Sequence, residues 1–341
     1  MFLTIILVHF GVVAFLLFGG GFLLDSIVLN FLLSQGILVV PTLIFLLVFE
    51  CRERRPVPQM PMPGVPQMPM PGAPQMPMSG AWRPFEAAAF HKVKISTLLM
   101  IVLCTFLIMP LVTVLNALTM FFADNAVAAL EGDIVSTPFL AMLFMIGIFG
   151  PFCEEFVFRG VIYRSYRRNG NYNDNMRYQN IRNNGLSAIF LSSLLFGLMH
   201  MNFNQALYAF AIGVFLALLV EAAGSLWASV FCHMFFNSCQ VVLMYVSDSI
   251  LDSIYGQAVN EAAGLSTQEL LAALSVYLII AAVTTPIAGC VIVWIAKNEG
   301  RQEAFQDMFR RRGRHADYLL SVPLIIAVVL CLGYMSLELL L

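Results

Sequence analysis

The sequence predicts an all-α, polytopic transmembrane helix bundle of eight to nine spans. Of its 341 residues, 60% are hydrophobic and only 11% are Asp, Glu, Lys or Arg, whereas a soluble domain carries about 25% charged residues. The 18 Lys and Arg residues are balanced by 20 Asp and Glu, so the chain has no basic surplus with which to bind nucleic acid. This composition excludes a soluble two-domain protein, a disordered chain and a nucleic-acid-binding protein.

Apolar runs long enough to be helices in a ~30 Å hydrocarbon core recur along the chain. Nine of them lie at about 2–24, 27–49, 95–122, 138–162, 186–201, 205–222, 226–247, 270–296 and 317–341. Only Asp25 marks a turn between the first two runs, so the span count is eight or nine. A tight turn is expected at 201–204, and Pro41 and Pro286 are expected to bend the helices that contain them.

The loop charges predict how the chain is oriented in the membrane. Lys and Arg gather in three loops, at 50–94, 163–185 and 297–316, while the alternate loops carry acidic residues. With nine spans, every basic loop lies on one side, which the positive-inside rule makes cytoplasmic. We therefore expect a multi-pass protein of the cell membrane, with the amino terminus and the basic loops in the cytoplasm and the carboxyl terminus outside.

The chain divides into three parts. Residues 1–49 form two N-terminal transmembrane helices, residues 50–94 a cytoplasmic Pro/Met-rich linker, and residues 95–341 a membrane-embedded bundle. The linker contains an eight-residue repeat that begins Gln59-Met-Pro-Met-Pro-Gly-Val-Pro66, and its prolines are incompatible with a helix or a sheet. It is interpreted as an extended spacer or as a docking segment for a proline-recognising partner.

Ionisable residues inside apolar runs indicate function, because each costs free energy in a membrane. Three of them stand alone, and structural or solvated positions are expected for His9, Glu221 at a helix end and Glu338 near the carboxyl terminus. The others lie in three apolar runs, and the amide side chain of Asn237 accompanies them. They are Glu154, Glu155 and Arg159 in the fourth run, His200 in the fifth, and His233, with Asn237, in the seventh. This cluster is the candidate site.

The spacing within the cluster predicts its local geometry. Glu155 and Arg159 are four residues apart, so they share a helix face and are expected to form an ion pair. Glu154 points about 100° away from Glu155, toward another neighbour. His233 and Asn237 are also four residues apart and present polar atoms along one stripe.

This set of side chains is compatible with several functions. A carboxylate and an imidazole can take the proton from a water molecule that attacks a carbonyl, and a second imidazole and an amide can stabilise the resulting oxyanion. Glu154, His200 and His233 are also candidate ligands for Zn, although the chain has no HExxH motif. Proton-coupled transport and a purely structural polar network use the same residue types.

Three motifs of the cluster resemble a known family. Glu154-Glu155-x-x-x-Arg159, Phe196-x-x-x-His200 and His233-x-x-x-Asn237 resemble, in this order, the motifs of the CAAX-protease and bacteriocin-processing (CPBP) family of intramembrane proteases. The resemblance covers about 138–240. It implies that Glu154 and His200 activate the catalytic water, that His233 and Asn237 stabilise the oxyanion, and that Glu155 and Arg159 form a supporting pair.

The resemblance implies an intramembrane endopeptidase that acts, within the lipid bilayer, on a hydrophobic or lipid-tethered peptide. CAAX-type and bacteriocin-like substrates both stay open. So do a metal-free, glutamate-dependent mechanism and a Zn-dependent one, and no cofactor is certain. The alternative function is a non-catalytic or proton-coupled membrane transport protein that uses the same Glu/His cluster.

Overall fold

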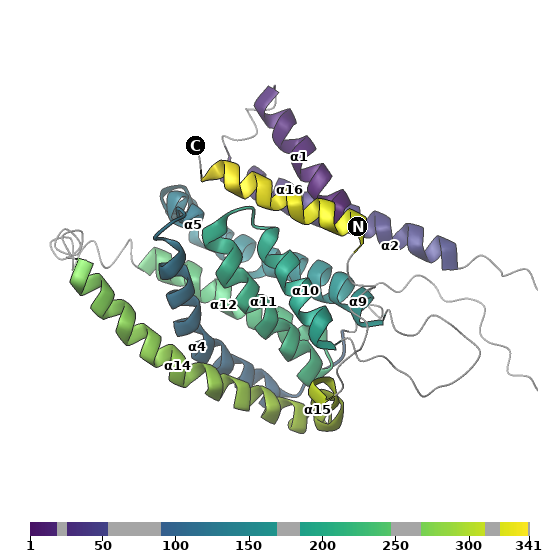
Figure 1. Ribbon diagram of the computed structural model, residues 1–341, viewed down its shortest axis with the longest axis vertical. Coiled ribbons are helices and arrows are strands. Elements are labelled where there is room, and N and C mark those ends of the chain that lie inside the picture. Colours follow the sequence, from purple (N-terminus) through teal and green to yellow (C-terminus); the bar gives the residue numbers. More distant parts are fainter. Residues whose placement is uncertain (19–25, 54–89, 169–184, 247–266, 311–320, 340–341) are drawn as a thin grey trace, which may run out of the picture.

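The computed structural model describes residues 1–18, 26–53, 90–168, 185–246, 267–310 and 321–339, and these residues are all-α (Figure 1). The Pro/Met repeat and the Asn-rich segment 169–184 lie outside the described residues. The helices of the first part are α1 (Phe2–Phe18) and α2 (Ile27–Glu53). The bundle then follows with α4 (Ile95–Thr119), α10 (Gly185–Leu198), α11 (Phe203–Ala223), α12 (Leu226–Val246), α14 (Thr267–Asn298), α15 (Gln302–Arg310) and α16 (Val322–Glu338).

Each apolar run of the sequence coincides with a helix, and the chain is a membrane protein. Among the described residues, six helical stretches are long and apolar enough to cross a membrane: Ile27–Val48, Ile95–Thr119, Phe139–Arg167, Phe203–Ala223, Leu226–Val246 and Leu271–Asn298. Three further apolar helices, α1, α10 and α16, are shorter. The outward faces of these helices expose large apolar side chains, as lipid-facing surfaces do.

The helices form layers around a central group (Figure 1). α10, α11 and α12 lie in the middle, with α4 and α14 packed together along one side. On the opposite side, α1 contacts both α2 and α16, and α2 also packs against the helix that contains Glu154. The two N-terminal helices therefore form part of the wall of the bundle.

Two local features bring α10 and α11 into close contact. A Cβ atom on Gly197 would lie 2.5 Å from the carbonyl oxygen of Ala206, so only glycine permits this approach. The predicted tight turn is present between them: Met201 has a φ of 54°, and Asn202 caps α11 by accepting a hydrogen bond from the backbone N–H of Gln205 at 3.1 Å.

The fourth apolar run is a compound helix and not a uniform α-helix. It consists of α7 (Phe139–Met142), the π-helix η2 (Leu143–Phe149), α8 (Gly150–Glu155), the π-helix η3 (Phe156–Tyr163) and α9 (Arg164–Arg168). Two short helices, α5 (Ala126–Ala129) and α6 (Glu131–Ser136), precede it. The π-helical segments flank the six residues of α8 that carry Glu154 and Glu155, and π-helical turns occur frequently at functional sites.

Pro151 explains an interhelical contact at the start of α8. The N–H of Gly150 reaches back to the carbonyl of Met145, and Pro151 has no N–H to donate to a carbonyl of the preceding turn. Side chains of α12 supply donors to two carbonyls of the segment before Pro151. Asn237 Nδ2 donates to Ile146 O at 3.2 Å and Ser238 Oγ donates to Gly147 O at 3.4 Å.

Of the two positions expected for Glu221, structural or solvated, the structure shows the structural one. The residue is only 7% exposed, and its carboxylate accepts hydrogen bonds from the Tyr163 hydroxyl and from Arg167 Nε. Arg301 Nε also donates to its backbone carbonyl at 3.0 Å. Glu221 is buried because residues from α9 and from the segment after α14 cover the end of α11.

The two other isolated residues match their expected environments. The His9 ring makes edge contacts with Phe10 and with Tyr334 of α16, which is a structural position between α1 and α16. Glu338 is exposed at the end of α16.

Candidate active site

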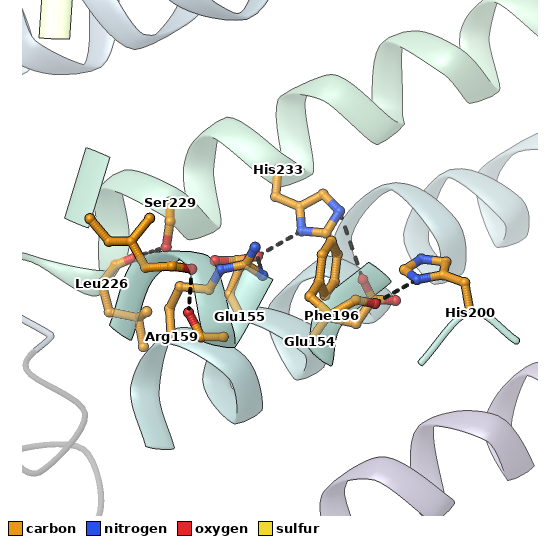
Figure 2. A network of polar contacts seen from close by, with 10 residues as sticks. Glu154, Glu155, Arg159, Phe196, His200, Leu226, Ser229 and His233 are labelled. Carbon is orange, nitrogen blue, oxygen red and sulfur yellow. Dashed lines mark hydrogen bonds and ion pairs between the residues drawn. The ribbon is translucent and has the colours of Figure 1, made fainter. Parts of the chain in front are cut away.

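The residues of the candidate site come from separate elements of the bundle. Glu154 and Glu155 end α8, Arg159 lies in η3, His200 follows α10, and His233 and Asn237 lie on α12. Figure 2 shows Glu154, Glu155, Arg159, His200 and His233 gathered at one place. Segments nearly 80 residues apart in the chain meet there, because His233 contacts Glu155 across a sequence separation of 78.

A buried ion pair forms the base of the site. Arg159 Nη1 lies 2.7 Å from Glu155 Oε1, and both side chains are 0% exposed, which confirms the pair expected from the spacing. The guanidinium of Arg159 also lies 4.2 Å above the centroid of the Phe196 ring. On α11, Gly213 leaves the necessary room, since a Cβ there would lie 3.1 Å from Arg159 Nη2. The charge on each buried group is therefore compensated by the other.

His233 connects the two glutamates (Figure 2). Its Nδ1 lies 3.0 Å from Glu155 Oε1, and its Nε2 lies 3.8 Å from Glu154 Oε2. Because an ionised carboxylate can only accept, Nδ1 of His233 is the donor to Glu155. This bond fixes the ring and directs Nε2 toward Glu154. The separation of 3.8 Å exceeds a direct hydrogen bond and is compatible with a bridging water.

His200 is oriented by a different kind of partner. Its Nδ1 lies 2.9 Å from the backbone carbonyl oxygen of Phe196, one turn earlier. A carbonyl only accepts, so Nδ1 is the donor in this contact. The contact therefore selects the tautomer of the neutral ring in which Nε2 is the acceptor.

Glu154 and His200 line one cavity of about 140 Å³, which we call the Glu154–His200 cavity. This volume is well above the roughly 10–15 Å³ that a single water requires. The Glu154 side chain is 21% exposed, in contrast to the buried Glu155. The remaining lining residues are Phe158, Phe196 and Met199 from the bundle and Ser34, Gln35 and Leu38 from α2. Water and a carboxylate–imidazole pair can therefore meet at this cavity.

Neither Asn237 nor His233 is among the residues that line this cavity. One N–H of the Asn237 amide donates to the carbonyl of Ile146, and this hydrogen bond links α12 to η2. An amide nitrogen has two N–H groups, so the second remains as a donor one helical turn beyond His233.

Glu154, His200 and His233 are the candidate metal ligands of this site. Within the described part of the chain, no group of three or more His, Cys, Asp and Glu side chains is placed to hold a metal ion. Structural and catalytic Zn sites take three or four such ligands at about 2.0–2.3 Å. Glu154, His200 and His233 do not meet that arrangement here.

Sequence reasoning missed the α2 residues at the cavity. Ser34 and Gln35 are adjacent polar residues in an otherwise apolar run, which was the available signal. Their position beside Glu154 depends on how α2 packs against α8 and η3, and local sequence patterns carry no information about that packing.

Comparison with known proteins identifies the part of the chain that contains the site. Residues 136–239 match a family model described as type II CAAX prenyl endopeptidase Rce1-like. The matched segment contains every candidate site residue from Glu154 to Asn237 and excludes α1 and α2. No curated protein and no solved structure matched the chain.

Proposed function

Because residues 136–239 form a domain of the Rce1-like type II CAAX prenyl endopeptidase family, a family of hydrolases, we propose that this chain hydrolyses a peptide bond in a hydrophobic or lipid-tethered peptide at the Glu154–His200 cavity. The observation that carries the proposal is that a carboxylate and an imidazole with a free Nε2 line one cavity large enough for water. Such a pair can take the proton from water as it attacks a carbonyl.

In the proposed reaction, water lies between Glu154 and His200 Nε2 and attacks the carbonyl carbon of the scissile bond. The proton that the water loses is accepted by this pair and passed to the amine of the leaving group, so the C–N bond breaks and no proton is left over. His200 keeps its orientation through its bond to the Phe196 carbonyl.

The oxyanion is proposed to be stabilised from α12. His233 donates through Nε2 when its ring carries both protons, and the carboxylate of Glu155 at Nδ1 stabilises that charged ring. Glu155 remains ionised because Arg159 is its ion-pair partner. The second N–H of Asn237 is the other proposed donor. Glu155 and Arg159 are positioning residues in this scheme.

The cavity and its setting support an apolar substrate. Phe158, Phe196, Met199 and Leu38 give the cavity an apolar wall, and the surrounding helices are apolar enough to lie in a bilayer. A CAAX-type prenylated peptide is the first candidate because of the family to which the domain belongs, and a bacteriocin-like hydrophobic peptide is the second. The basic loops imply that cleavage takes place toward the cytoplasmic side.

The test is cleavage by the purified full-length protein in lipid vesicles. Two probes are used, a farnesylated peptide with a Cys-aliphatic-aliphatic-X end and an unprenylated hydrophobic peptide of the same sequence. We expect cleavage to fall by at least about 10²-fold in Glu154→Ala and in His200→Ala, the scale of a lost general acid–base group. Leu32→Ala, on an exposed face of α2, is the control. Equal cleavage by Glu154→Ala and the unmodified protein contradicts the proposal, and a chelator arm tests metal dependence.

A further inference from the structure

Helix α2 lies outside the matched domain, yet it forms one wall of the Glu154–His200 cavity. Ser34, Gln35 and Leu38 line the cavity opposite the residues of the domain, and α2 packs against α8 and η3, which carry Glu154 and Phe158. A peptide that reaches Glu154 therefore passes next to α2.

Gln35 is the unusual residue on this wall. It is 8% exposed, and its Oε1 is buried without a hydrogen-bond partner among the described residues. An unpaired buried amide oxygen costs free energy, and more so where the surroundings are apolar. By contrast, the Ser34 hydroxyl donates a hydrogen bond to the Phe31 carbonyl at 2.7 Å, and the Leu38 side chain has no polar group.

The substrate backbone is the partner that fits this acceptor. A peptide must be extended for a protease to reach its carbonyl carbon, and in a bilayer the N–H groups that leave helical pairing have no water to bond. Each of them needs an acceptor from the enzyme. The Gln35 amide also carries donor N–H groups, so it can pair with a peptide group irrespective of the substrate side chains.

Resting on the proposed function, we propose that α2 is the substrate-binding wall of the site and that Gln35 Oε1 accepts a hydrogen bond from a substrate main-chain N–H next to the scissile bond. Gln35 is then a substrate-binding residue supplied from outside the family domain. It selects for an extended peptide backbone, whereas the apolar wall selects the side chains.

The first test pairs a protein variant with a substrate variant. In the farnesylated peptide, each amide near the scissile bond is replaced in turn by an ester, which removes one N–H and little else. We expect the unmodified protein to lose about tenfold in kcat/KM at one position, the scale of one hydrogen bond. Gln35→Leu is expected to raise KM about tenfold with kcat nearly unchanged, and to cleave that ester and the amide equally well. Leu32→Ala is the matched control on the same helix.

The second test reads binding without turnover. A photoreactive p-benzoylphenylalanine replaces Ser34 in full-length Glu154→Ala protein, and the same peptide is offered under light; the control position is Val40, which is 54% exposed on α2. Peptide captured at position 34 and not at position 40 supports the proposal.

The outcomes separate the two claims. Cleavage without capture at position 34, or a Gln35→Leu variant that discriminates against the ester as the unmodified protein does, overturns the role of α2 and Gln35 and leaves the protease function intact. Capture without cleavage by any active-site-intact sample overturns the protease function and retains α2 as a peptide-binding wall. Neither capture nor cleavage overturns both.

Discussion

Removing the charge of Arg159 tests whether the buried ion pair supports folding, catalysis or both. Arg159 and Glu155 are fully buried and 2.7 Å apart, and the guanidinium lies over the Phe196 ring. In Arg159→Met, an unbranched stem remains but Glu155 loses its compensating charge. The carboxylate must then stay buried without its cation or take up a proton.

The expected cost follows from this burial. Breaking a buried ion pair by removing one partner costs about 3–5 kcal/mol, mostly because the other charge is left uncompensated. The lost cation–π contact adds about 0.5–2 kcal/mol for a desolvated cation. The double variant Glu155→Gln/Arg159→Met has no charge at either position of the pair, so we expect it to recover most of the roughly 3–5 kcal/mol that is lost when the ion pair is broken. It is not expected to recover activity, because His233 then lacks a carboxylate at Nδ1.

Thermal unfolding in detergent, read by intrinsic fluorescence, measures stability, and peptide cleavage in vesicles measures activity. We expect the unmodified protein to be the most stable, the double variant to be intermediate and Arg159→Met to be the least stable. Cleavage is expected to be lost in both variants. A double variant no more stable than Arg159→Met refutes the charge-compensation argument. A double variant that cleaves normally refutes the role assigned to Glu155 in positioning His233.

Two further variants test contacts between helices. Gly197→Ala places a Cβ 2.5 Å from the Ala206 carbonyl oxygen, so it should force α10 and α11 apart and lower the free energy of unfolding by about 1–3 kcal/mol. The control is Gly289→Ala, whose Cβ would meet no neighbouring atom within 4 Å and which should leave the unfolding temperature unchanged or raise it. Equal shifts of the unfolding temperature in the two variants contradict the packing argument. Asn237→Ala should lower stability by about 1–3 kcal/mol because the Ile146 carbonyl loses its donor, and unaltered thermal unfolding would show that this bond is dispensable.

The sequence predicted the helices and the short-range contacts because these depend on local patterns. Apolar run length placed the spans, and the four-residue spacing predicted the Glu155–Arg159 pair. It did not predict the burial of Glu221, because the covering Arg301 lies 80 residues away in the chain. Nor did it place Gln35 at the cavity, since the packing of α2 on α8 is set by surfaces and not by spacing.

The compound helix shows why the role of Asn237 requires the structure. A spacing argument pairs Asn237 with His233 as a second donor, and nothing in that argument involves α8. Pro151 has no N–H to donate to a carbonyl of the preceding turn, and side chains of α12 donate to the carbonyls of Ile146 and Gly147 through Asn237 and Ser238. The same two bonds fix α12, and therefore His233, relative to the helix that carries Glu154. An amide at position 237 thus links α12 to the helix that carries Glu154, and its second N–H is the donor that we propose for the oxyanion.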